Sequence, residues 1–194
     1  KLVAFASQAQ LGDPTDKNTQ VGPVTTPGQY QKIIDYIEIA REEGARCVLG
    51  GGPAPEHGAQ FVQPTIFADV DNQMRIAQEE VFGPVLHVMR YQRRDLDRVI
   101  DAINATGYGL TLGVHSRIES TPRRVAQRVR AGNCYVNRNM IGAVVGVQPF
   151  GGEGLSGTGP KAGGPHYLLR FVTERTLTIN TAAVGGNASL LALE

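Results

Sequence analysis

The clearest helical pattern in the chain follows Thr26 and Pro27. Apolar residues recur after them at the spacing of one helix face, at positions 30, 33, 34, 37 and 40. Thr26 is predicted to cap this helix with Pro27 at its first position, and Gly44 is predicted to end it. An amphipathic helix of this kind needs an apolar layer to pack against.

Two further helices are predicted later in the chain by the same spacing. Asp95 is predicted to cap the first, whose apolar face is formed by residues 96, 99, 100 and 103. Ser120 or Thr121 is predicted to cap the second, with Pro122 at its first position. Residues 164–171 predict a short helix, residues 2–10 the end of another, and residues 70–79 an irregular connection.

Strands are predicted where short apolar runs lie between turn residues, at 46–49, 85–89, 110–114 and 134–137. A strictly alternating run at 176–180 predicts a half-buried strand. Since helices and strands alternate, the predicted fold class is α/β, a layered domain with a mostly parallel sheet. In such sheets ligand loops follow the carboxyl ends of strands, and residues 80–84 and 142–164 lie at such ends.

The segment 142–164 is unusually rich in glycine, with nine glycines. Apolar and aromatic residues such as Phe150 interrupt it, which favours an ordered functional loop over a flexible linker. Residues 152–157 satisfy the spacing GxGxxG, but Pro160 would interrupt the helix that a dinucleotide fingerprint requires. No Ser or Thr follows Lys161, so a P-loop is also rejected.

Composition excludes several classes of function. The 194 residues carry a formal net charge of +1, with 41% hydrophobic and 19% charged residues, as in an ordinary soluble α/β protein. This balance lacks the basic patch that nucleic-acid binding requires, and the arginines at 123–130 predict the solvent-facing side of a helix. No apolar run reaches the length of a membrane span, so we expect a cytoplasmic protein without a membrane or nucleic-acid partner.

No metal or redox motif is present. The two cysteines lack a partner motif, which predicts reduced thiols, and Cys47 is interpreted as core packing in a strand. The four histidines are isolated from one another and from other metal-ligand residues, so no metal site is predicted. They are His57, His87, His115 and His166.

Several motifs together resemble the catalytic domain of the aldehyde dehydrogenase superfamily. They follow the family's order: GDP at 12–14, VGP at 21–23, PTI at 64–66, EEVFGP at 79–84, GYGL at 107–110, AGN at 131–133, VN at 136–137 and PFGG at 149–152. From residue 90 the chain looks most like the dehydrogenase module of bacterial proline-utilisation A proteins, through GNCYVNRNMIGAVVGVQPFGGEGLSGTGPKAGGPHYLLR at 132–170 and TINTAAVGGNASLL at 178–191. The residues through about 78 look like aldehyde dehydrogenases in general.

The resemblance implies an NAD-dependent dehydrogenase of proline catabolism that oxidises L-glutamate γ-semialdehyde, the open form of pyrroline-5-carboxylate, to L-glutamate. Residue by residue, it implies that Glu80 accepts hydrogen bonds from the nicotinamide ribose of NAD and that Phe82 packs against that end of the cofactor. The backbone N–H groups of Gly142 and Ala143 are implied to hold the substrate α-carboxylate. Phe150 matches an aromatic residue that packs on the aliphatic part of the substrate.

The nucleophile implied by the resemblance has no counterpart in this chain. In the family a cysteine attacks the aldehyde, hydride passes to NAD, and water hydrolyses the thioester. That cysteine belongs to a segment before residue 1, so we expect a partial catalytic domain over 1–173 that is inactive by itself, with no catalytic residue of its own. Cys134 is not expected to replace it, because no histidine or glutamate lies beside it in the sequence.

Two alternatives remain open from the sequence. One alternative is part of a dehydrogenase for another aldehyde, since the first part of the chain resembles aldehyde dehydrogenases in general. A second class is non-enzymatic, a folding or oligomerisation module. Residues 174–194 are predicted to form an oligomerisation strand and tail that pair with another copy of the chain.

Overall fold

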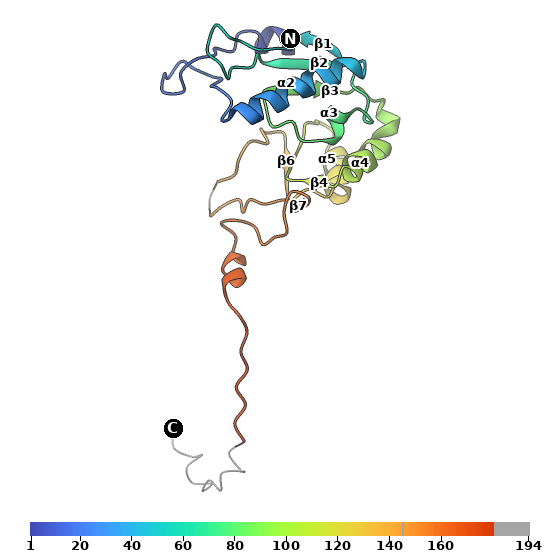
Figure 1. The fold of residues 1–194 in the computed structure, drawn as a ribbon. Coiled ribbons are helices and arrows are strands. Elements are labelled where there is room, and N and C mark those ends of the chain that lie inside the picture. The colour runs from blue at the N-terminus through green and yellow to red at the C-terminus, as the bar shows by residue number, and fades with distance from the viewer. Residues whose placement is uncertain (145, 181–194) are drawn as a thin grey trace. The chain divides into compact units, whose positions relative to one another are not determined.

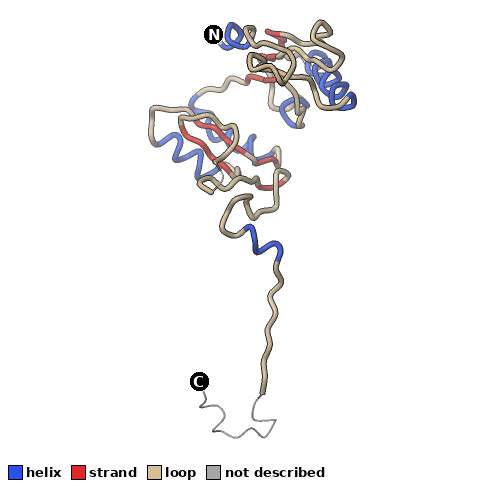
Figure 2. Tube along the Cα trace, turned by 90° about the vertical axis from the view of Figure 1, so that its left-hand side faces the viewer, coloured by secondary structure: helices blue, strands red, loops and turns tan. Residues whose placement is uncertain are grey.

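The computed structural model describes residues 1–144 and 146–180, and it divides the chain into two compact units. Unit 1 comprises Lys1–Tyr108 and Ser116–Arg130, and unit 2 comprises Gly109–His115 and Ala131–Glu194. Helices and strands occur in both, as Figures 1 and 2 show, and two of the strand pairs are parallel. The predicted α/β class is therefore confirmed.

Unit 1 contains a three-stranded sheet in the order β1-β2-β3, formed by β1 (Arg46–Leu49), β2 (Thr65–Ala68) and β3 (Val85–Val88). The central strand β2 is antiparallel to β1 and parallel to β3, with Thr65 opposite Val85. A register shift between Cys47 and Leu49 interrupts the β1–β2 pairing. The strands predicted at 46–49 and 85–89 are confirmed to within a residue, whereas the central strand β2 is not among the strands predicted from the sequence.

Helix α2 (Pro27–Glu42) covers the sheet of unit 1 and supplies much of its core (Figure 1). Ile33, Ile37 and Phe67 are fully buried there, and burying each such side chain stabilises a fold by about 1.5–3 kcal/mol. The Thr26 hydroxyl accepts a hydrogen bond from the Gln29 N–H at 3.2 Å, which confirms the predicted cap. The helix thus begins where its capping residues predict.

The remaining helices of unit 1 are α1 (Leu2–Ala6), α3 (Arg75–Gln78), α4 (Leu96–Ala105) and α5 (Ser120–Arg128), with the 3-10 helix η1 (Arg93–Asp95) before α4. Helix α3 lies in the segment predicted to be irregular, so that prediction is wrong. Asp95 precedes α4, but its side chain makes no capping hydrogen bond. Helix α5 follows Glu119 and holds Pro122 at its third residue, a position that still needs no backbone donor.

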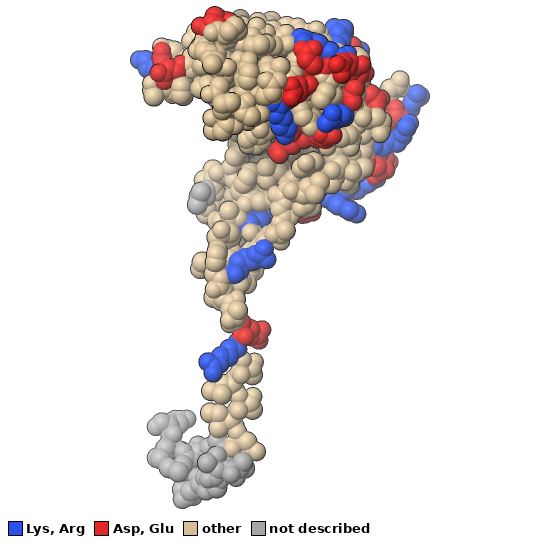
Figure 3. All heavy atoms as spheres, in the orientation of Figure 1, with Lys and Arg blue, Asp and Glu red and all other residues tan. Residues whose placement is uncertain are grey.

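The arginines of α5 pair with acidic residues of α4. Arg124 and Arg128 both contact the Asp97 carboxylate, and Arg128 Nη2 lies 2.9 Å from Asp101 Oδ1. Figure 3 shows basic and acidic side chains interspersed over the visible helices of unit 1. Exposed pairs of this kind contribute little individually, so the cluster aligns the two helices more than it stabilises them.

Unit 2 is built on a parallel pair of strands, β5 (Thr111–Val114) and β6 (Asn133–Val136), with Thr111 opposite Asn133. Strand β4 (Tyr108–Gly109) enters this unit at Gly109 and pairs with β7 (Glu153–Gly154), and the 3-10 helix η2 (Tyr167–Phe171) follows. The short helix predicted at 164–171 is therefore present in a tighter form. Strand β6 precedes the glycine-rich segment 142–164, and β7 lies within it.

The strand predicted at 176–180 is not formed in the single chain. Residues 172–180 belong to neither a helix nor a strand, and Leu177 and Ile179 are 73% and 68% exposed. An alternating strand buries one face only when another strand accepts its backbone hydrogen bonds. The predicted division of the chain at residue 174 stays a prediction, since residues 181–194 lie outside the described part.

Among residues 1–144 and 146–180, no helix is long and apolar enough to cross a membrane. The same residues hold no cluster of three or more His, Cys, Asp or Glu side chains able to bind a metal ion.

Candidate functional site

In unit 1 the predicted cofactor residues Glu80 and Phe82 lie together on the segment that joins α3 to β3. Both are exposed, Phe82 by 75% of its surface. The backbone of Phe82 has φ +57°, in the left-handed region that non-glycine residues rarely adopt. Strained, exposed residues of this kind are concentrated at functional sites, so the geometry supports a role for this segment.

Helix α2 holds the backbone of this segment. Gln29 Nε2 donates to the carbonyl oxygens of Val81 and Phe82, at 2.9 and 3.1 Å. Lys32 Nζ donates to the carbonyl oxygen of Glu80 at 2.7 Å. A Cβ placed on Gly83 would lie 2.5 Å from Ile33 Cδ1, so a glycine is needed where the segment passes the buried Ile33. Gln29 and Lys32 were not predicted as site residues from the sequence. They are polar residues of α2 that lie next to its apolar positions 30 and 33.

Glu79, which precedes Glu80, belongs to a separate polar cluster. Its carboxylate accepts hydrogen bonds from Arg75 Nε at 3.1 Å and from the Tyr36 hydroxyl. Hydrogen bonds from Arg75 and then Tyr36 lower the pKa of the Glu79 carboxyl, and the bond to Glu79 raises the pKa of Tyr36. In contrast, no hydrogen bond or ion pair engages the Glu80 carboxylate within the described part of the chain. Glu80 is therefore available to a ligand and Glu79 is not.

In unit 2 the predicted substrate residues Gly142, Ala143 and Phe150 lie on the glycine-rich segment. The Tyr135 hydroxyl donates to the carbonyl oxygen of Gly142 at 3.0 Å, and Gly142 has φ +69°. Among residues 1–144 and 146–180, no acceptor is found for the N–H groups of Gly142 and Ala143. Two adjacent backbone N–H groups without an acceptor suit an anion. Val145 lies outside the described residues.

Asn133 and Ala162 hold the part of the segment around Phe150. Asn133 Nδ2 donates to the Pro149 carbonyl at 3.0 Å, and its Oδ1 accepts from the Gly151 N–H at 3.3 Å. Phe150 exchanges two backbone hydrogen bonds with Ala162, at 3.0 and 2.9 Å. The segment is thus attached on both sides of Phe150, as expected of an ordered loop rather than a linker. The predicted cofactor residues belong to unit 1, and the predicted substrate residues belong to unit 2.

The surroundings of Cys134 are not those of a nucleophile. Cys134 is exposed on β6, and partial desolvation raises the pKa of its thiol. A reactive thiolate needs a lowered pKa, which a neighbouring cation or helix N-terminus supplies. The half-buried Cys47 packs against the core and donates to the Leu49 carbonyl at 3.3 Å, in agreement with its predicted packing role.

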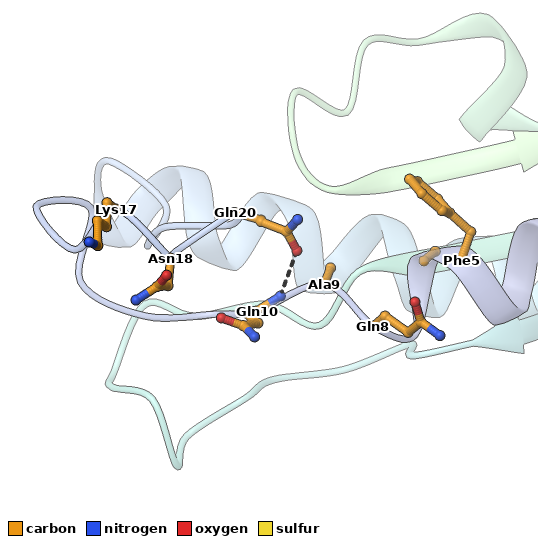
Figure 4. Close-up of a pocket in the computed structure, with 8 residues that line it drawn as sticks. Phe5, Gln8, Ala9, Gln10, Lys17, Asn18 and Gln20 are labelled. Atoms are coloured by element: carbon orange, nitrogen blue, oxygen red, sulfur yellow. Dashed lines mark hydrogen bonds between the residues drawn. The ribbon is translucent and has the colours of Figure 1, made fainter.

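A hollow of about 600 Å³ lies beside α1 in unit 1 (Figure 4). Its lining is mostly neutral, with the Gln10 N–H bonded to Gln20 Oε1 at 3.1 Å. None of the predicted site residues lines it. Its full lining is Phe5, Ala6, Gln8, Ala9, Gln10, Lys17, Asn18 and Gln20.

Comparison with protein families gives one family match, to the aldehyde dehydrogenase family over residues 1–177. The bifunctional protein PutA of Rhizobium meliloti is 57% identical over 157 residues, which are 80% of this chain and 13% of PutA. The 1-pyrroline-5-carboxylate dehydrogenase of Geobacillus thermodenitrificans is 43% identical over 178 residues, which are 92% of this chain and 34% of that enzyme. The chain thus spans only a minor part of these relatives.

Solved structures of PutA and of an aldehyde dehydrogenase are also similar to this chain. A substituted variant of Bradyrhizobium japonicum proline utilization A (PutA) superposes with a TM-score of 0.85 and 56% identity, over 94% of this chain and 18% of the other. The NAD⁺ complex of an aldehyde dehydrogenase from Bacillus cereus superposes with a TM-score of 0.76 and 36% identity, over 84% of this chain and 32% of the other.

Proposed function

The chain belongs to the aldehyde dehydrogenase family, and from this premise we propose that the complete protein oxidises L-glutamate γ-semialdehyde to L-glutamate with NAD in proline catabolism. The observation that carries the proposal is the similarity to relatives of two kinds, a bifunctional PutA and a separate 1-pyrroline-5-carboxylate dehydrogenase. Pyrroline-5-carboxylate is the cyclic form of the semialdehyde, so both kinds point to one substrate.

The cofactor proposal assigns Glu80 and Phe82 to the nicotinamide end of NAD. An exposed carboxylate without an internal partner among the described residues is a pure acceptor, suited to the two hydroxyls of a ribose. The exposed ring of Phe82 offers a flat apolar surface that limits movement of a bound nicotinamide. Bound NAD would supply the hydride acceptor for oxidation of the aldehyde.

The substrate proposal assigns Gly142, Ala143 and Phe150. The free N–H groups of Gly142 and Ala143 are suited to the α-carboxylate that distinguishes the semialdehyde from simple aliphatic aldehydes. The half-buried Phe150, attached through Ala162 and Asn133, is assigned to the aliphatic carbons. No catalytic residue is assigned within these 194 residues, because desolvation raises the pKa of the Cys134 thiol and the Cys47 thiol is engaged by the Leu49 carbonyl.

The complete protein is expected to prefer an aldehyde that carries an α-carboxylate. NADH formation is expected to be about a hundredfold more efficient with L-glutamate γ-semialdehyde than with butanal, because an anion site left empty forfeits its binding energy. Replacement of Cys47 and Cys134 by serine is expected to leave the ratio of the two efficiencies unchanged. Equal efficiency with both aldehydes would instead favour a dehydrogenase for another aldehyde.

A second role, in oligomerisation, is favoured by the exposed apolar side chains of residues 172–180. Val172, Leu177 and Ile179 are exposed and belong to no strand in the described part of the chain, and alternating sequences of this kind pair with sheet edges. We propose that residues 174–194 join one copy of the protein to another.

Deletion of residues 174–194 is therefore expected to lower the mass of the assembly by a factor of about two or more. Light scattering of the complete protein at micromolar concentration measures this mass. Leu177→Asp with Ile179→Asp, which keeps the chain length, is expected to act in the same way because charged side chains disfavour strand pairing at these positions. An unchanged mass in both variants would exclude this role.

A further inference from the structure

An arginine without an acidic partner lies next to the substrate segment of unit 2. Arg138 follows strand β6 and is exposed, and its guanidinium carbon lies 4.7 Å from the centre of the Tyr135 ring. Its Nε donates to the Asn139 carbonyl at 3.2 Å, while its two terminal nitrogens have no partner among the described residues. The stacking and this bond restrain the guanidinium, but they leave its positive charge available to an anion.

The other charges of unit 2 do not neutralise Arg138. Every ion pair found within residues 1–144 and 146–180 lies in unit 1. The described residues of unit 2 carry four basic side chains and two acidic ones, Glu153 and Glu174. The Lys161 ammonium is directed to the Gly132 carbonyl. The described part of unit 2 therefore has a positive net charge, to which Arg138 contributes an unneutralised cation.

Tyr135 connects this charge to the turn assigned to the substrate carboxylate. Its buried ring carries the Arg138 guanidinium, and its hydroxyl donates to the Gly142 carbonyl at 3.0 Å. The N–H groups of Gly142 and Ala143 have no acceptor in the described part of the chain, but they offer an anion only partial charges. A full charge acts over about 8 Å before physiological salt screens it, so Arg138 extends the attraction beyond the turn itself.

We propose that Arg138 is a specificity-determining residue, whose charge attracts the carboxylate of the aldehyde substrate to the N–H groups of Gly142 and Ala143. The proposal rests on the substrate assignment made above. It adds that selection of an anionic aldehyde over a neutral one depends on a side-chain charge as well as on backbone donors. Lysine would also supply this charge, whereas methionine and glutamine would cover the Tyr135 ring without one.

The kinetic test compares two aldehydes in variants of the complete protein. Arg138→Met and Arg138→Gln are each expected to lower kcat/KM for L-glutamate γ-semialdehyde about tenfold, mainly through KM, and to change kcat/KM for butanal by less than about twofold. Arg138→Lys is expected to recover most of the loss because it keeps the charge. Arg170→Met is the matched control and is expected to change neither efficiency, since Arg170 is another exposed arginine of unit 2 that bonds to Thr158 Oγ1 at 3.2 Å.

A binding measurement tests the same proposal without turnover. The product L-glutamate carries the same α-carboxylate, and calorimetry of the complete protein is expected to show its Kd rising about tenfold in Arg138→Met. Raising the salt concentration from about 0.05 to about 0.5 M is expected to weaken L-glutamate binding by the unsubstituted protein more than by Arg138→Met, because screening acts on a charge that the variant lacks.

Three results would overturn the proposal. Equal losses with both aldehydes would show that Arg138 acts only by supporting Tyr135. A loss that Arg138→Lys does not recover would exclude a role for the charge, and unchanged kinetics in both neutral variants would exclude any role in selection. Failure of the proposed function is read separately in the unsubstituted protein, as absence of NADH formation from the semialdehyde or as equal efficiency with both aldehydes.

Discussion

Glu80→Ala in the complete protein is expected to lower kcat/KM for NAD about a hundredfold, mainly through a higher KM. The carboxylate is exposed on the segment between α3 and β3, and no group of the described residues donates a hydrogen bond to it. Its hydrogen-bonding capacity is therefore free for ribose hydroxyls, and charge-assisted bonds are about twice as strong as neutral ones. The substitution removes both acceptors at once.

The measurement is initial-rate NADH formation with NAD varied at saturating aldehyde, together with NADH binding followed by its fluorescence. Glu42→Ala is the matched control, since it removes an exposed carboxylate from the last turn of α2. We expect it to change neither quantity by more than twofold. If Glu80→Ala binds NADH as tightly as the unsubstituted protein, the ribose assignment is wrong.

Gly132→Ala is expected to lower the free energy of unfolding by about 3 kcal/mol, the upper end of the usual cost of overpacking. A Cβ at position 132 would lie 1.8 Å from the carbonyl oxygen of Gly151 and 3.0 Å from the Cα of Gly152. Both obstacles are backbone atoms, which cannot rotate away as a side-chain end does. The attachment of the Phe150 region to β6 would therefore be displaced.

Gly28→Ala provides the control for this substitution. Gly28 lies in the first turn of α2, and nothing lies within 4 Å of the Cβ that alanine would add. Alanine is there expected to leave stability unchanged or to raise it by up to about 1 kcal/mol. Urea unfolding of the two variants of the complete protein compares them, and a loss below 1 kcal/mol for Gly132→Ala would contradict the close packing of residues 132 and 151.

The motifs quoted from the sequence identify the family correctly, and the matching family profile covers residues 1–177. Such motifs are short and local, but their order along the chain is specific. The roles of Glu80, Phe82, Gly142, Ala143 and Phe150 stay predictions. The structure adds that Glu80 and Phe82 have exposed side chains, and that the N–H groups of Gly142 and Ala143 have no acceptor among the described residues.

Helices and strands with strong local signals follow from the amino-acid sequence alone. The start of α2 follows from Thr26 and Pro27, whose capping bond and fixed φ act within one turn, and its buried face follows from helical spacing. The same local logic failed at residues 176–180, because an alternating pattern specifies a strand only where a partner strand is present.

Only the tertiary structure decided how the candidate cofactor segment is held. Gln29 and Lys32 reach carbonyls 48 to 53 residues away in the chain, and backbone carbonyls leave no signature in a sequence because every residue has one. The clash that requires Gly132 likewise involves the backbone of Gly151, which strand β6 meets only after folding. Local spacing determines which face of an element is apolar, whereas contacts between distant backbone segments depend on the packed fold.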